Sequence, residues 1–163
     1  MVVLRGIPSA ISPELLYALA RMGHGDELGA EPHVTRQSVR SLERGENGGD
    51  SAASASYCAA SLHIPELLEA VLKLFPLDTY VHSPAAVMDL VDSDKQRGLA
   101  VQVWETYSRI LKEAGSDKPL EKVERFEFYE RAKKAFAVVA TGETSLYGNL
   151  IIKKGVIAAE DLC

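Results

Sequence analysis

His24 is the residue best suited to exchange protons, because it stands between two glycines in the segment Gly23-His24-Gly25-Asp26-Glu27. Histidine side chains have an unperturbed pKa of about 6.5, so they gain and lose protons near neutral pH. The flanking glycines favour a turn that carries the imidazole away from the preceding helix and close to an acid. A histidine after a helix also serves as a cap or a surface group, so the local sequence leaves the catalytic and the structural interpretation open.

Five further polar residues complete the set of candidates, and each also has a structural interpretation. Asp78 could be a turn or cap residue. Arg125 and Tyr129 could belong to an aromatic seam with solvated charges, and Tyr147 and Asn149 could be turn residues. Taken together with the histidine, the phenols, amide and carboxylate suit an uncharged, hydroxyl-rich ligand and proton transfer without a cofactor.

Motifs for other kinds of chemistry are missing from the sequence. There is no glycine-rich phosphate loop, no Gly-x-Ser-x-Gly element and no metalloprotease histidine pair. Cys58 and Cys163 form neither a Cys-x-x-Cys pair nor a cluster with zinc-ligand spacing. We interpret His33, His63 and His82 as non-functional, and we expect neither a metal nor a cofactor.

Length and charge limit the class of protein that this chain can be. Its 163 residues predict a single domain, residues 1–163, that buries enough surface to fold without disulfides. The formal net charge of -5 argues against non-specific binding to nucleic acid or to an anionic membrane. The sequence has no secretory signal and no apolar run long enough to span a bilayer, which predicts a cytoplasmic protein.

Helical and strand patterns alternate along the chain and must position these candidates. Ser12 as N-cap, Pro13 as first residue and Gly23 as a left-handed stop define the first helix. Further helices are predicted over residues 66–75, 101–114 and 128–134, with a helical turn over 83–90. Strands are predicted over residues 78–82, 135–140 and 149–153, and a polar loop over 92–95. Residues 123–128 alternate as in a strand but could turn helical at Phe126. Helices mixed with buried strands predict an α/β layer structure around one sheet.

Residues 28–61 differ in character from the rest of the chain. They are rich in Ser, Ala, Gly and Arg, and their few large apolar residues follow neither the helical nor the strand period. Such a segment buries too little apolar surface to offset the entropy of ordering it. We predict a long, irregular and mobile insert within the domain, with a weak helix near residues 34–43.

Several motifs resemble those of a known family. They are Ser12-Pro13-Glu14-Leu15-Leu16, Gly23-His24-Gly25-Asp26-Glu27, Pro76-Leu77-Asp78-Thr79-Tyr80-Val81, Ser83-Pro84-Ala85-Ala86-Val87-Met88, the stretch over residues 124–143, and Leu146-Tyr147-Gly148-Asn149. These motifs resemble the fucose mutarotase and ribose pyranase family, and closely its animal L-fucose mutarotases. The resemblance covers residues 4–27 and 62–155.

The resemblance implies a fold, an activity and a set of site residues. The fold is a mixed sheet between layers of helices, α/β/α, assembled into a ring-like homo-oligomer. The activity is interconversion of the α and β anomers of free L-fucose without metal or cofactor. The family's proton donor corresponds to His24. Family residues that contact the sugar correspond to Asp78, Tyr129, Tyr147 and Asn149, and Arg125 matches a nearby family arginine that we assign to sugar binding. Our hypothesis is that His24 serves the ring oxygen while one tyrosine handles the anomeric proton.

Residues 28–61 depart from that family. There the family has an aliphatic strand and an Asp-x-Asn-Phe-Pro motif whose aspartate contacts the sugar. Glu31-Pro32 matches this motif poorly, and no residue here corresponds to that aspartate. We therefore expect a core strand and a sugar ligand to be lost, with Asp26 left as the acid near His24. The hypotheses are an L-fucose mutarotase, a sugar-binding or structural oligomer subunit without turnover, and a ribose pyranase-type enzyme.

Overall fold

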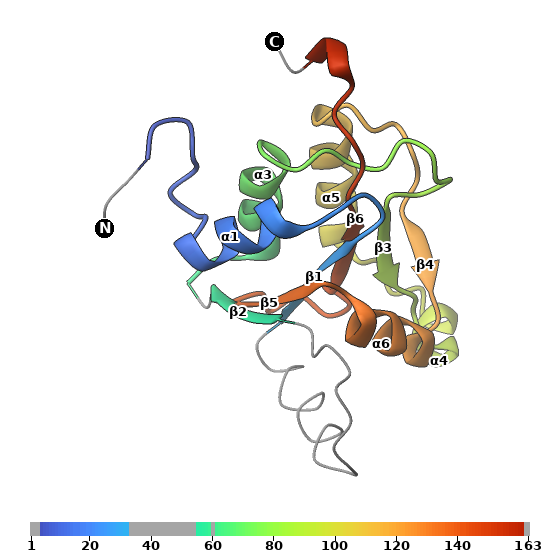
Figure 1. Ribbon diagram of the computed structural model, residues 1–163. Helices are drawn as coiled ribbons and strands as arrows, with labels where there is room; N and C mark the ends of the chain where they lie inside the picture. Colours follow the sequence, from blue (N-terminus) through green and yellow to red (C-terminus); the bar gives the residue numbers. More distant parts are fainter. Residues whose placement is uncertain (1–3, 33–54, 60, 162–163) are drawn as a thin grey trace, which may run out of the picture.

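A mixed β-sheet between two layers of helices forms the body of the protein (Figure 1), as the sequence and the family resemblance led us to expect. The structure is a computed structural model, and it describes residues 4–32, 55–59 and 61–161. In this part of the chain no helix is long and apolar enough to cross a membrane.

The sheet has six strands in the described residues, in the order β2-β5-β1-β6-β3-β4. The strands are β1 Glu27–Pro32, β2 Ala55–Ala59, β3 Ala85–Met88, β4 Glu121–Val123, β5 Ala137–Thr141 and β6 Leu150–Lys153. β6 runs antiparallel to its neighbours β1 and β3, and the other neighbouring pairs are parallel. β1 and β6 are therefore the two strands at the centre, and they run in opposite directions.

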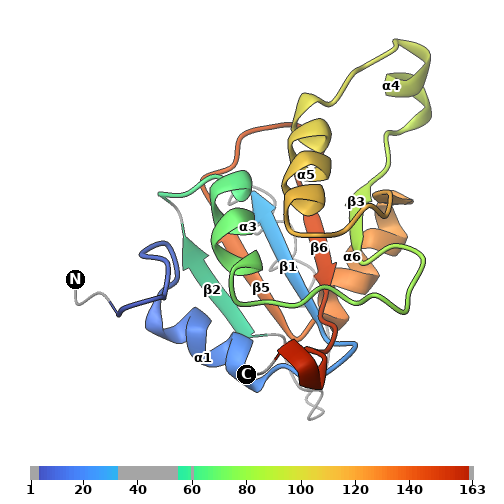
Figure 2. The ribbon, with the colours of Figure 1, turned by 90° about the horizontal axis from the view of Figure 1, so that it is seen from above.

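Helices cover both faces of this sheet. They are α1 Pro13–Arg21, α3 Ile64–Leu72, α4 Asp92–Gln96, α5 Gln102–Glu113 and α6 Arg125–Lys134, followed by a 3₁₀ turn at Ala159–Asp161. Figure 2 looks onto the face covered by α1, α3 and α5, and Figure 1 shows α6 on the opposite side. Each face has its own hydrophobic core, so the two layers of helices are held by separate sets of side chains.

The first helix begins as predicted but ends differently. Ser12 Oγ accepts a hydrogen bond from the backbone N–H of Leu15 at 3.2 Å, which caps the N-terminus. The helix ends at Met22 in extended conformation, and the left-handed residue is Gly25 with φ +85°, not Gly23. The chain therefore turns one residue after His24, and the turn leads directly into β1.

A strand stands where we predicted the start of an irregular insert. β1 pairs with β5 on one side and β6 on the other, and its Leu28 and Ala30 are buried in the first core. A Cβ on Gly29 would lie only 3.3 Å from Val138, so the small residue permits close packing there. The prediction was wrong because intrinsic strand preference is weak in Gly, Ala and Pro, whereas backbone partners on both sides stabilise a central strand.

The far end of the predicted insert is also a strand. β2 pairs in parallel with β5 at the edge of the sheet, and Tyr57 packs against the first core. The expected loss of a core strand is therefore wrong. The weak helix predicted near residues 34–43, and His33, lie outside the described residues.

Three shorter predictions are also corrected. Residues 78–82 form bends instead of a strand, and only the preceding Leu77 makes an isolated bridge, with Lys154. The helical turn predicted over residues 83–90 is instead the strand β3, whose four residues are all buried. In a short apolar run, periodicity cannot distinguish a buried strand from a helical turn. The predicted polar loop over residues 92–95 is the start of α4. The remaining helices and strands are confirmed to within a few residues. In the segment 123–128 the strand β4 ends at Val123 and the helix α6 begins at Arg125, so most of the predicted strand is helical.

Candidate active site

The six candidate residues fall into two groups at opposite ends of the central strands. His24 and Asp78 lie where β1 begins and β6 ends, since Glu27 pairs with Lys153 and the N–H of Asp78 donates to the Lys153 carbonyl. Asn149 immediately precedes Leu150, at the other end of β6. With about 3.3 Å of rise per residue, β6 alone separates the two ends by ~10 Å. We name them the imidazole cluster (His24, Asp78, Tyr80) and the phenol cluster (Arg125, Tyr129, Tyr147, Asn149).

Backbone contacts hold the turn that carries His24. The N–H of Gly25 donates to the Lys154 carbonyl and the N–H of Lys154 donates to the Asp26 carbonyl, both at 2.8 Å. The Asp26 carboxylate accepts from the N–H of Gly23 at 2.7 Å. Lys154 Nζ donates to the carbonyls of Leu19 and Met22 at the end of α1. The C-terminal end of β6 therefore fixes both the helix end and the turn after it.

Asp78 is the acid that contacts the imidazole, so our expectation that Asp26 would take this place is wrong. His24 Nε2 lies 3.4 Å from Asp78 Oδ1, and the His24 side chain is 46% exposed while that of Asp78 is 4% exposed. Burial by itself raises the pKa of Asp78, but hydrogen bonds from the Tyr80 N–H and from His24 outweigh it and leave the pKa below its usual value. An ionised carboxylate therefore lies beside an accessible imidazole.

Close packing brings these two residues together although 54 positions separate them (78 − 24). A Cβ on Gly155 would lie 2.4 Å from the Leu77 carbonyl oxygen and 2.8 Å from the Asp78 Cα. Only glycine at this position allows the segment around Asp78 to lie against the end of β6. The Tyr80 ring lies 5.7 Å from the His24 ring, centroid to centroid, and is exposed.

Side chains of α5 hold the main chain of the phenol cluster. Tyr147 has φ +56°, a left-handed conformation that is uncommon for a residue with a side chain. Trp104 Nε1 donates to the Tyr147 carbonyl at 2.9 Å, and the buried Tyr107 hydroxyl donates to the Gly148 carbonyl at 2.7 Å. Burial raises the pKa of Tyr107, so this hydroxyl stays a donor. Trp104 and Tyr107 lie in the helix predicted over residues 101–114, and the sequence pattern contained no sign of their hydrogen bonds.

Apolar packing and a cation near an aromatic ring hold the other side chains of this cluster. Tyr129 and Tyr147 both pack against the second core, and the Arg125 guanidinium lies 5.9 Å from the Tyr129 ring centroid. Asn149 is buried, and its Nδ2 has no hydrogen-bond partner among the described residues. Because a buried donor without a partner is costly, this amide is suited to a ligand's oxygen atom.

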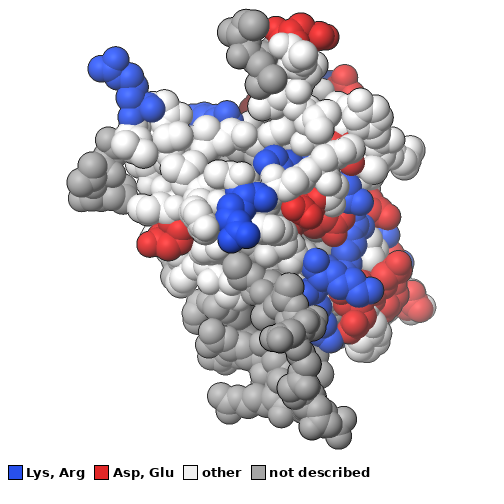
Figure 3. Space-filling model, viewed as in Figure 1, with Lys and Arg blue, Asp and Glu red and all other residues white. Residues whose placement is uncertain are grey.

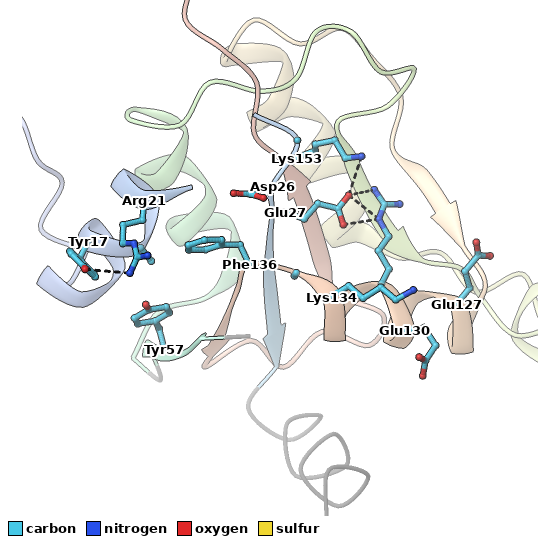
Figure 4. Close-up of a pocket in the computed structure, with 14 residues that line it drawn as sticks. Tyr17, Arg21, Asp26, Glu27, Tyr57, Glu127, Glu130, Lys134, Phe136 and Lys153 are labelled. Atoms are coloured by element: carbon cyan, nitrogen blue, oxygen red, sulfur yellow. Dashed lines mark hydrogen bonds and ion pairs between the residues drawn. The ribbon is translucent and has the colours of Figure 1, made fainter. Parts of the chain in front are cut away.

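A cavity of about 790 Å³ lies beside the imidazole cluster and contains none of the six candidates. α1, α6 and the start of β1 surround it, and Figure 4 shows acidic and basic side chains together on its wall. Arg131 binds Glu27 through two nitrogens at 2.8 and 3.1 Å and also donates to Glu121. The charges of Arg131 and Glu27 on this wall therefore neutralise one another.

The wider surface shows the same mixing of charge. On the face seen in Figure 3, acidic and basic side chains lie next to one another over the region of α6 and β4. Among residues 4–32, 55–59 and 61–161, no three His, Cys, Asp or Glu side chains gather in a group that could hold a metal ion.

Comparisons with known proteins identify the family of this chain. The model of the RbsD / FucU transport protein family matches residues 5–157. The human protein named fucose mutarotase is 60% identical over 163 residues, covering 99% of each chain, and the zebrafish (Danio rerio) protein of that name is 60% identical over 164 residues, covering all of both. A solved structure from Streptococcus pneumoniae, described as fucose mutarotase in complex with L-fucose, superposes with a TM-score of 0.78 at 40% identity and covers 95% of this chain and 100% of its own. We conclude that the chain belongs to the RbsD / FucU family.

Proposed function

We propose that this protein interconverts the α and β anomers of L-fucose by opening and closing the sugar ring, with general acid and base catalysis and no cofactor. The observation that carries the proposal is the composition of the two clusters in a chain 60% identical to proteins named fucose mutarotase. An imidazole, two phenols and an unpartnered amide are the groups needed to bind hydroxyls and to move protons between neighbouring sugar oxygens.

We also propose that two copies of the chain share each site. Within one copy the imidazole cluster and the phenol cluster lie too far apart to contact one monosaccharide. Exposed apolar side chains lie next to each cluster: Val156 and Ile157 follow Gly155 at the imidazole end, while Phe126 and Leu146 lie beside the phenol cluster. Two different surfaces that meet between copies form a head-to-tail contact, and such contacts close into rings.

In the shared site each cluster has a separate task. Protonated His24, beside the Asp78 carboxylate, delivers a proton to the ring oxygen as the bond from C1 to that oxygen breaks. Tyr147 or Tyr129 of the neighbouring copy takes the proton of the anomeric hydroxyl while its own phenol proton moves to an acceptor, and C1=O1 of the aldehyde forms. After rotation about C1–C2 the two transfers run in reverse on the other face. The Asn149 amide donates to a sugar oxygen throughout.

Saturation-transfer NMR of L-fucose tests the activity. The wild-type protein should transfer magnetisation between the two anomeric proton signals, and His24→Ala should slow this exchange by ~10²–10⁴-fold. Exposed Glu69→Gln on α3 is the matched control and should exchange at the wild-type rate. Saturation-difference signal without exchange would instead support a binding subunit without turnover, and faster exchange of D-ribose than of L-fucose would support a pyranase.

Mixing two inactive variants tests the shared site. His24→Ala and Tyr147→Phe each remove one cluster, so each alone should be slow. Assembled together in equal amounts, about a quarter of the head-to-tail contacts combine an intact imidazole cluster with an intact phenol cluster. Recovery of a comparable fraction of the wild-type exchange is expected. Failure of the mixture to exceed either variant alone, with mixed oligomers demonstrated by mass spectrometry, would show that one copy contains the whole site.

A further inference from the structure

The hydroxyl group of Tyr147 already has a proton acceptor within its own copy of the chain. It donates a hydrogen bond to the carboxylate of Asp94 on α4. The other carboxylate oxygen of Asp94 accepts from the Arg97 guanidinium, one turn further along the chain. The Asp94 side chain is 13% exposed, whereas that of Arg97 is 75% exposed, so the carboxylate is partly enclosed by its two partners.

This hydrogen bond determines whether the Tyr147 phenol donates a hydrogen bond to the sugar or accepts one from it. A phenol has one proton to donate, and the lone pairs of its oxygen can still accept. Trp104 and Tyr107 hold the carbonyls of Tyr147 and Gly148, which keeps the phenol beside Asp94. The phenol proton is directed at that carboxylate. The N–H of Val91 also points at the phenol oxygen, at 3.5 Å. Towards a sugar, therefore, Tyr147 is an acceptor.

We propose that Asp94 is a positioning residue that makes Tyr147 the proton acceptor for the anomeric hydroxyl. This inference rests on the function proposed above and chooses between the two tyrosines, which that function left open. Among the described residues no carboxylate accepts a hydrogen bond from Tyr129, whose ring lies beside the Arg125 guanidinium and packs against the apolar second core.

The proton transfers balance within this arrangement. As the C1–O5 bond of the sugar breaks, its electron pair goes to O5, which takes a proton from the His24 imidazolium. The O1–H proton passes to the Tyr147 oxygen while the Tyr147 proton passes to Asp94, and C1=O1 forms. The site then holds neutral His24 and protonated Asp94. Ring closure on the other face returns both protons and restores the starting charges.

The charges around the phenol favour this starting state. Three charged groups act on Tyr147 or its partner: Asp94, Arg97 and Arg125. The hydrogen bonds from Tyr147 and Arg97 lower the pKa of Asp94, and the hydrogen bond to Asp94 raises the pKa of Tyr147. At neutral pH the carboxylate is therefore ionised and the phenol protonated, so the acceptor is ready before the sugar binds.

Substitution of Asp94 with a pH profile tests the proposal. Asp94→Asn should lower the exchange rate at saturating L-fucose by ~10–100-fold, with little change in the concentration that gives half the maximal rate. Between pH 6 and pH 9, any change of rate that comes from the protonation of His24 is common to both proteins, so the ratio of their rates is compared. Relative to the wild type, the Asp94→Asn rate should rise with pH, because the variant must ionise the phenol itself, whose ordinary pKa is about 10. Asp92→Asn, an exposed acid on the same helix, is the matched control and should behave as wild type.

A double variant separates action through Tyr147 from other effects of Asp94. Tyr147→Phe and Tyr147→Phe/Asp94→Asn should have equal rates, and Asp94→Glu should recover the wild-type pH profile. An Asp94→Asn variant with the rate and profile of Asp92→Asn would overturn the proposal while leaving the mutarotase function intact, as would additive losses in the double variant. Absence of exchange by the wild-type protein would end both. Circular dichroism of each variant verifies the fold, and Asp94→Glu keeps the carboxylate in place should the asparagine variant unfold.

Discussion

The imidazole end and the phenol end of the central strands are held in place by different means. At the imidazole end, main-chain hydrogen bonds between the turn and Lys154 position His24, whose own side chain remains 46% exposed. At the phenol end, side chains of α4 and α5 position Tyr147 and Gly148. One end thus depends on how closely backbones approach, and the other on individual polar groups.

This difference predicts different responses to mutation. A backbone-built site is sensitive to added volume at a glycine and tolerant of many side-chain changes nearby. A site built from side chains is sensitive to the loss of a single hydroxyl or carboxylate, even when the shape is conserved. The four predictions below test this comparison, from the largest expected effect to the smallest.

Gly155→Val should have the largest effect on stability. Its Cβ would lie 2.4 Å from the Leu77 oxygen, so the segment around Asp78 must move away from β6. We expect a loss of about 3 kcal/mol in the free energy of unfolding, measured by urea denaturation. Ala100→Val, which adds a larger side chain at an exposed position, is the control and should stay close to wild type. An unchanged midpoint for Gly155→Val would show that the imidazole end does not depend on close backbone approach.

Tyr107→Phe should destabilise the phenol end by removing a single hydroxyl group. The variant keeps the ring but leaves the buried Gly148 carbonyl without its donor. We expect a loss of about 2 kcal/mol in the free energy of unfolding, together with slower anomer exchange. The control is Tyr17→Phe, since the Tyr17 hydroxyl lies at the surface. Equal stability of the two variants would contradict the assignment of this end to individual polar groups.

Lys154→Met should have a smaller effect at the imidazole end. The variant removes the ammonium from the carbonyls of Leu19 and Met22 while the backbone hydrogen bonds of the turn remain. We expect a loss of about 1 kcal/mol in the free energy of unfolding, because a cation near the end of a helix is moderately stabilising. A loss as large as that of Gly155→Val would mean that the side chain, not the backbone, holds the turn.

The acid sensitivity of the imidazole end should depend on Asp78. Its pKa in the folded state lies below the value of 3.8 expected for the unfolded chain, so its contribution is fully present above pH 3.8. That contribution is lost as the pH falls through the lower, folded pKa. Urea midpoints measured from pH 5 downwards should therefore fall less steeply for Asp78→Asn than for wild type. Identical slopes would show that Asp78 is not stabilised as an anion in the fold.

Local patterns in the sequence predicted much of the fold correctly. The Ser12 cap, the stripe of α5 and the apolar runs of β5 and β6 are signals carried by neighbouring residues, and the structure confirms them. β1 and β3 were missed because their residues acquire strand geometry from partners on both sides. Such strands need little propensity of their own, so the Gly, Ala, Glu and Pro of β1 and the short apolar run of β3 hide them.

The candidate site divides in the same way. The sequence alone determined which chemical groups are present. Through the family's motifs it also indicated the candidate site residues, which are His24, Asp78, Arg125, Tyr129, Tyr147 and Asn149. Only the tertiary structure decided that Asp78 contacts His24, that Asp94 contacts Tyr147, and that the two clusters lie at opposite ends of β6. The reason is that these contacts depend on strand pairing and backbone approach between segments distant in the chain, which no local pattern of residues encodes.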